Sequence, residues 1–160
     1  MGMAAKHVIK RILLMLAGYF VAVLVGLIAI WAIYLILSTL PGSPEYFGVL
    51  ATMTPVALFF VAALVPFIFL LAIALTGAQA LIFALIAEFF SLRNVWLHML
   101  FGAAASAAGF ALIWPTTASD VNIYRWADYG VIAGAGLIAG LVYWLIAGRD
   151  AGFRRPLPEL

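Results

Sequence analysis

Long apolar runs, separated by short polar breaks, make up most of this chain. The first run covers residues 12–37, and the breaks after it hold Pro41, Gly42 and Pro44. About 20 apolar residues in a helix suffice to cross the hydrocarbon core of a bilayer. Proline and glycine together end a helix and favour a tight connection. The pattern therefore predicts a first membrane span at 8–37.

The second apolar run, residues 46–90, is too long for one span. As a single helix it would reach about 67 Å, roughly twice the hydrocarbon thickness. Thr76 and Gly77 are the most plausible break, with bends at Pro55 and Pro66 before it. We therefore expect a second span at 47–75 and a short extra helix at 78–90, at the membrane edge. Counting 78–90 as a full span gives an alternative model with five spans.

Two further spans follow Arg93 and Asn94. The third is expected at 95–114, ending at Pro115, and the fourth at 126–147, ending at Gly148. The predicted fold class is an all-α membrane protein, a bundle of four transmembrane helices with a short membrane-edge helix before the third span. Residues 1–160 form a single integral membrane domain in this interpretation.

The basic residues predict an orientation. In the four-span model, seven of the eight Lys and Arg residues share one side of the membrane, and Arg125 lies on the other. The seven are Lys6, Lys10, Arg11, Arg93, Arg149, Arg154 and Arg155. Basic residues collect on the cytoplasmic side of membrane proteins, so both termini are expected in the cytoplasm. Five spans would place the last three arginines outside, which favours four.

Composition narrows the possible partners. Hydrophobic residues make up 68% of the chain and charged residues 9%, so most of its surface must face lipid. The net charge of +2 and the pI of about 9.2 suggest contact with anionic lipid headgroups, and no nucleic acid is expected. The absence of cysteine excludes disulfides and thiolate chemistry.

Small residues at helical spacing are the clearest pattern within the predicted spans. Small side chains let helix backbones approach closely in lipid. We expect these faces to pack the helices together, or to bind a second copy or a larger complex. The residues are Gly18, Ala22 and Gly26 in the first span, Gly102, Ser106 and Gly109 in the third, and Gly130, Gly134, Gly136 and Gly140 in the fourth.

Glu88 is the one acidic residue set in an apolar segment, and it is a possible intramembrane ionisable site. It lies close to Arg93 and to the predicted inner boundary. A structural role, in contact with water or paired with a basic group, is favoured over proton or cation handling. His7 and His98 have no partner at metal-ligand spacing and are expected to be interfacial.

Motifs for known chemistry are absent from the sequence. It has no nucleophile elbow, no His-Glu-x-x-His and no phosphate-binding loop. We therefore expect no enzymatic activity, no cofactor and no metal site.

Two segments, AEFFSLR at 87–93 and AGLVYWLIAGRDAG at 139–152, carry a resemblance. They resemble uncharacterised small four-span inner-membrane proteins of alphaproteobacteria. The resemblance implies four spans in a bacterial inner membrane and implies no activity. The favoured function is a non-catalytic accessory or structural protein that packs with itself or a larger membrane complex. The alternative is an oligomeric transporter or channel for a small solute or ion.

Overall fold

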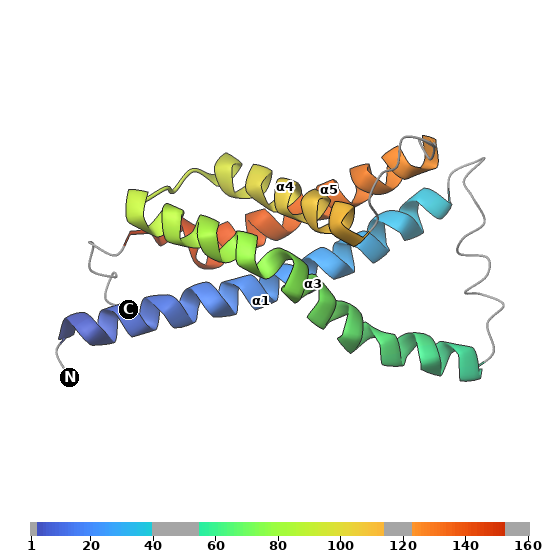
Figure 1. The fold of residues 1–160 in the computed structure, drawn as a ribbon, viewed down its shortest axis with the longest axis horizontal. Coiled ribbons are helices and arrows are strands. Elements are labelled where there is room, and N and C mark those ends of the chain that lie inside the picture. The colour runs from blue at the N-terminus through green and yellow to red at the C-terminus, as the bar shows by residue number, and fades with distance from the viewer. Residues whose placement is uncertain (1–2, 40–54, 114–122, 153–160) are drawn as a thin grey trace.

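The computed structural model describes residues 3–39, 55–113 and 123–152 of the chain. The described residues form four helices along the long axis of the molecule (Figure 1): α1 (Met3–Ser38), α3 (Pro55–Phe90), α4 (Val95–Ile113) and α5 (Ile123–Ile146). A short 3-10 turn, η2 (Gly148–Asp150), follows α5. All four helices are long and apolar enough to cross a membrane. The predicted all-α four-helix bundle is confirmed, and the chain is a multi-pass membrane protein.

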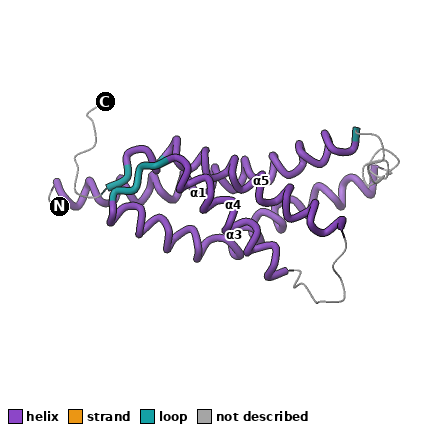
Figure 2. Tube along the Cα trace, turned by 90° about the horizontal axis from the view of Figure 1, so that it is seen from above, coloured by secondary structure: helices purple, strands orange, loops and turns teal. Residues whose placement is uncertain are grey.

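Three of the predicted spans agree closely with helices. Candidate spans lie at Val8–Leu37 in α1, Val95–Ile113 in α4 and Ala127–Ile146 in α5. The start of α1 and the turn after α5 lie at the same end of the bundle (Figure 2). An even number of spans requires this arrangement.

The predicted break at Thr76 and Gly77 is wrong. Helix α3 continues through both residues, so 78–90 is the C-terminal part of a long helix and not a separate membrane-edge helix. The candidate span in α3 is Ala63–Phe90, later in the chain than the predicted 47–75. Residues 47–54 of that prediction lie outside the described residues. One glycine destabilises a helix by only about 1 kcal/mol, whereas unpaired backbone groups in lipid cost several kcal/mol, so the helix continues.

Local signals set the ends of the helices around the α3–α4 connection. Ser91 follows α3 with a positive φ of 52°, and the Leu92 amide donates to the Ala87 carbonyl at 2.8 Å. This is the backbone pattern of a Schellman motif, in which a left-handed residue ends the helix. The Asn94 side chain then accepts from the Trp96 amide at 2.9 Å and caps the start of α4. The connection is therefore short and well defined.

Small residues form the seam between α4 and α5. A Cβ added to Gly136 would lie 2.9 Å from the Cα of Ala103, and one added to Gly140 would lie 2.9 Å from the Cα of Met99. Only glycine permits backbones this close. Helix α1 packs on the other side of α5, where Cβ atoms at Gly18 and Gly26 would contact Ile146 and Ala139 at 3.3 Å. Helix α5 is thus the centre of the bundle.

The beginning of α3 stands apart from the other helices. All residues from Ala63 to Ile68 are exposed, which covers every face of a helix, and Phe59 and Phe60 are exposed too. We call residues 55–68 the α3 arm. In Figure 1 the arm diverges from α4 and α5 toward one side. A helix of 36 residues is about 54 Å long, more than a bilayer core requires.

Candidate functional site

Arg11 and Glu88 form a buried ion pair at the end of the bundle where α1 begins and α3 ends. The Arg11 Nη2 atom lies 2.6 Å from Glu88 Oε1, and Arg11 Nε donates to the same oxygen at 2.8 Å. Their side chains are 1% and 3% exposed. The two residues come from membrane-spanning segments that are 77 positions apart in the chain. Glu88 is therefore paired with a basic residue inside the protein.

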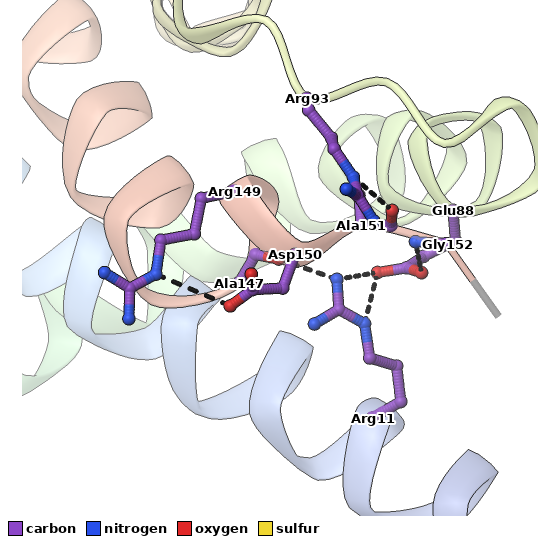
Figure 3. Close-up of polar contacts among 8 residues, drawn as sticks. All are labelled: Arg11, Glu88, Arg93, Ala147, Arg149, Asp150, Ala151 and Gly152. Carbon is purple, nitrogen blue, oxygen red and sulfur yellow. Dashed lines mark hydrogen bonds and ion pairs between the residues drawn. The ribbon is translucent and has the colours of Figure 1, made fainter. Parts of the chain in front are cut away.

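The pair also holds the segment that follows α5 (Figure 3). Arg11 Nη2 donates to the Ala147 carbonyl at 2.7 Å, and the Gly152 amide donates to Glu88 Oε2 at 2.6 Å. Both carboxylate oxygens of Glu88 thus accept hydrogen bonds from the chain. We call Arg11, Glu88, Arg93 and the segment 147–152 the clasp.

Arg93 joins the clasp from the α3–α4 connection. Its Nε donates to the Ala151 carbonyl at 3.1 Å, while Trp144 Nε1 donates to the Arg93 carbonyl at 2.7 Å. The clasp therefore ties together α1, α3, the start of α4 and the end of α5. Segments 87–93 and 139–152 meet here in space.

Backbone geometry lets the segment after α5 enter the clasp. Gly152 has a φ of 131°, which residues with a side chain rarely adopt, and a Cβ there would lie 2.6 Å from Ser91 Oγ. Gly148 is packed against the His98 ring, because a Cβ there would lie 2.7 Å from Nε2. Two glycines thus allow the turn to pass close to α4 and the α3–α4 connection.

His98 is enclosed beside the clasp and is only 1% exposed. The expected interfacial histidine is therefore covered by protein. Its ring stacks on Tyr143 with centroids 5.9 Å apart and meets Phe83 edge-on at 5.1 Å. Its Nδ1 lies 2.9 Å from the Asn94 carbonyl, which can only accept, so Nδ1 carries the proton.

Two buried nitrogens at this end have no hydrogen-bond partner among the described residues. They are Arg11 Nη1 and His98 Nε2. The first is a donor. The second is an acceptor when the ring is neutral, because the proton is on Nδ1. The two side chains contact consecutive residues of the turn after α5. Arg11 donates to the Ala147 carbonyl, and the His98 ring packs on Gly148.

The energetics of the clasp follow from burial. A charge moved out of water loses several kcal/mol of hydration, and its partner must compensate for that loss. Arg11 is surrounded by three hydrogen-bond contacts, two with Glu88 and one with Ala147. Removal of Glu88 would leave a buried, unpaired guanidinium. The charges of the clasp are therefore compensated only while α1, α3 and the segment after α5 lie together as they do here.

A second polar contact ties α1 to the middle of α3. Thr76 Oγ1 donates to the Ala72 carbonyl at 2.8 Å. The single hydroxyl proton of Tyr19 is then shared between Thr76 Oγ1 at 2.9 Å and the Ile73 carbonyl at 3.1 Å. These groups satisfy each other at the position where the sequence predicted a break in the helix.

Toward the other end of the bundle, α1 and α5 share a polar contact. The Tyr34 hydroxyl donates to Asp128 Oδ1 at 2.5 Å. The sequence suggested an ion pair between Arg125 and Asp128, but the Arg125 side chain lies outside the described residues.

The predicted small-residue faces have different outcomes. Gly102, Ser106, Gly136 and Gly140 meet across the α4–α5 seam, and Gly18, Ala22 and Gly26 face the bundle from α1. Gly109 packs near Thr76 of α3, where a Cβ would lie 3.4 Å from the methyl group. A Cβ at Gly130 would meet no described atom within 4 Å, and one at Gly134 only Ile33 at 3.9 Å. Gly130 and Gly134 therefore make no close contact with the described helices.

The sequence indicates Arg11 only as a residue that sets orientation, and not as a member of the site. Arg11 nevertheless lies on the same face as the small residues of α1. Among the described side chains of that helix, the buried positions are Arg11, Met15, Gly18, Ala22, Gly26 and Ala29, at spacings of three and four. A charged residue in register with a packing face was the available signal for burial.

The described residues contain no group of three His, Cys, Asp or Glu side chains that could hold a metal ion. Comparison of the chain with protein-family models, with curated proteins and with solved structures finds no match.

Proposed function

We propose that this chain is a non-catalytic accessory or structural protein of a bacterial inner membrane, which packs with itself or with a larger membrane complex. The observation that supports this function is the α3 arm. It carries large apolar side chains on every face, such as Phe59, Leu64 and Phe67. A neighbouring helix in the membrane could pack along it without displacing any other part of the bundle.

The clasp supports the same proposal. It joins α1, the end of α3 and the segment after α5 through buried polar contacts, whereas the described residues of the arm make no such contact. In lipid, helices associate through close packing, since lipid tails are as apolar as the side chains themselves. A rigid bundle with one projecting helix suits an assembly role.

Cysteine crosslinking tests this function, because the chain has no cysteine of its own. Single cysteines at each position from 63 to 68 sample all faces of the arm, and Leu100→Cys on the exposed face of α4 is the matched control. After treatment of membranes with a thiol-specific crosslinker, we expect a larger product for some of the arm variants and none for the control. Mass analysis of the product distinguishes a second copy from another protein. Absence of products at all six positions would contradict the proposal.

Transport of a small solute or ion is the alternative function, and Glu88 is the residue that favours it, because it is an ionisable group within a span. If liposomes containing the purified protein pass a solute or ion, and Glu88→Gln abolishes that flux, the protein is a transporter and not an accessory protein. Since both oxygens of Glu88 are engaged by the chain, we expect no such flux.

The proposed orientation places the clasp on the cytoplasmic side. Lys10, Arg11, Arg93 and Arg149 all belong to this end of the bundle, and Arg125 lies in the first turn of α5 at the other. A reporter enzyme that is active only in the periplasm, fused after Leu160, should be inactive. Activity of that fusion would mean that the C-terminus lies in the periplasm and that the proposed orientation is wrong.

A further inference from the structure

A long cavity of about 560 Å³ lies between the four helices. Its lining extends along α1 from Ile12 to Ile30 and includes residues of α3, α4 and α5. That part of α1 is about 27 Å long. The polar side chains in the lining are few, and two of them, Tyr19 and Thr76, already bond each other. The cavity is therefore narrow, apolar and nearly as long as the hydrocarbon core is thick.

The dimensions discriminate between possible occupants. A volume of about 560 Å³ is the space open to the centre of a water-sized sphere, so over about 27 Å the cavity is roughly 8 Å wide once the sphere's radius of about 1.4 Å is added. A helix with its side chains is wider, at about 10–12 Å. A helix of a second copy would therefore not fit, and water is disfavoured by the apolar lining. A single hydrocarbon chain is narrow and long enough to match the space.

One end of the cavity lies next to the clasp. Ile12 follows Arg11, Ala84 is one turn before Glu88, and Tyr143 is one turn before Ala147, and all three line the cavity. This end of the bundle carries Lys10, Arg11, Arg93 and Arg149 against Glu88 and Asp150, an excess of positive charge among the described residues. Lys10, Arg93 and Arg149 are exposed and can reach a headgroup at the membrane surface.

From this geometry we infer that the cavity is a binding site for an anionic phospholipid of the surrounding membrane. One acyl chain lies between the helices, and the acidic headgroup lies at the clasp end, near the exposed basic residues. Basic groups between transmembrane helices attract anionic headgroups, so the site should bind anionic phospholipids in preference to neutral ones. The cavity is formed within one copy of the chain, so this site does not depend on the accessory function proposed above.

Two neighbouring positions on α3 provide the matched variants. Ala80 lines the cavity, whereas Ala78 is exposed on the outside of the helix. Ala80→Phe fills the space of the acyl chain, and Ala78→Phe adds the same side chain toward lipid. The intact protein, purified in mild detergent, is mixed with equal amounts of phosphatidylglycerol and phosphatidylcholine and analysed by native mass spectrometry.

We expect the unaltered protein and Ala78→Phe to retain phosphatidylglycerol in preference to phosphatidylcholine, and Ala80→Phe to lose the bound lipid. The double variant K10Q/R149Q should retain lipid but lose the preference for phosphatidylglycerol. Equal retention by the two Phe variants, or equal binding of both lipids to the unaltered protein, would overturn the inference.

A second measurement covers the possibility that Ala80→Phe fails to fold. Phosphatidylglycerol with a photoreactive group on its acyl chain is activated in the unaltered protein, and the labelled residues are identified. Labels on cavity residues such as Phe101 and Ala105 are expected. Labels confined to exposed side chains such as Trp96 and Leu100 would contradict the site.

Discussion

The two ends of α3 differ in what surrounds them. At its C-terminal end, Glu88 is buried and every oxygen of its carboxylate has a partner from another part of the chain. In the α3 arm, six consecutive residues are exposed on all sides. One helix thus contains both a buried, hydrogen-bonded end and an end that is exposed on every face. The difference shows that apolar composition alone does not decide where a transmembrane helix packs, because the arm is as apolar as any other segment.

Polar contacts explain which part of α3 packs against the other helices. Tyr19 bonds α3 at Thr76 and Ile73, and Arg11 bonds it at Glu88. Both residues lie on α1, and both bonds fall in the second half of α3. Since lipid tails compete on equal terms with apolar side chains, hydrogen bonds and close packing are the forces that select one neighbour over lipid.

The largest expected effect is at the clasp. Glu88→Ala leaves the Arg11 guanidinium buried without its counter-charge, and we expect the free energy of unfolding to fall by about 3–5 kcal/mol. Unfolding of the purified protein in detergent, followed by circular dichroism against denaturant, measures it.

The control for the clasp is the double variant Arg11→Met/Glu88→Leu, which removes both charges. It should recover most of the lost stability, because an apolar pair of similar volume often replaces a buried ion pair without loss. If Glu88→Ala were as stable as the unaltered protein, the two ends of α3 would not differ in the way described.

A smaller effect is expected at the α4–α5 seam beside the clasp. Gly140→Ala places a Cβ against the carbonyl oxygen of His98 and 2.9 Å from the Met99 Cα, and overpacking of this kind costs about 1–3 kcal/mol. Gly130→Ala, in the same helix, meets no described atom within 4 Å and should be neutral or slightly stabilising, since alanine favours helix. Thermal unfolding of the two variants side by side is the measurement. Equal melting temperatures would show that the seam is looser than the structure has it.

The smallest effect is expected in the α3 arm. Phe67 is 63% exposed, so Phe67→Ala removes almost no contact within the chain. We expect the free energy of unfolding of the monomer to change by less than about 0.5 kcal/mol. The same detergent measurement as for Glu88→Ala provides the direct comparison. A loss of several kcal/mol in dilute monomer would mean that the arm packs within its own bundle.

The sequence predicted the spans of α1, α4 and α5 because their ends carry local signals. Asn94 caps α4, and Gly148 follows the end of α5. The middle of α3 misled the prediction, because Thr76 and Gly77 are breaking residues in water but are accommodated here by the Tyr19 hydroxyl and the Ala72 carbonyl. A contact with another helix cannot be read from the residues of α3 alone.

For the site, the sequence indicated Glu88 and its need for a partner, and proposed water or a basic group nearby. It did not indicate which basic group, since Arg93 is closer in sequence than Arg11. The choice depends on the way α1 lies against α3. Arg93 instead donates to the Ala151 carbonyl, and the Gly152 amide donates to the second carboxylate oxygen of Glu88. These last contacts depend on the turn after α5, whose path follows from glycine positions and tertiary packing.

The spacing of the clasp along the chain has a consequence for biogenesis. A ribosome makes Arg11 long before Glu88, and Glu88 before Ala147 and Gly152, which complete the site. The first helix must therefore enter the membrane with an uncompensated arginine, which is tolerable because Arg11 lies near the beginning of its span and its long side chain can reach the headgroup region. The guanidinium can leave that region for the protein interior only after α3 arrives. The clasp can thus close fully only after all four helices have been made. In a chain stalled or truncated before Gly152, Glu88 Oε2 would lack the amide that completes the site.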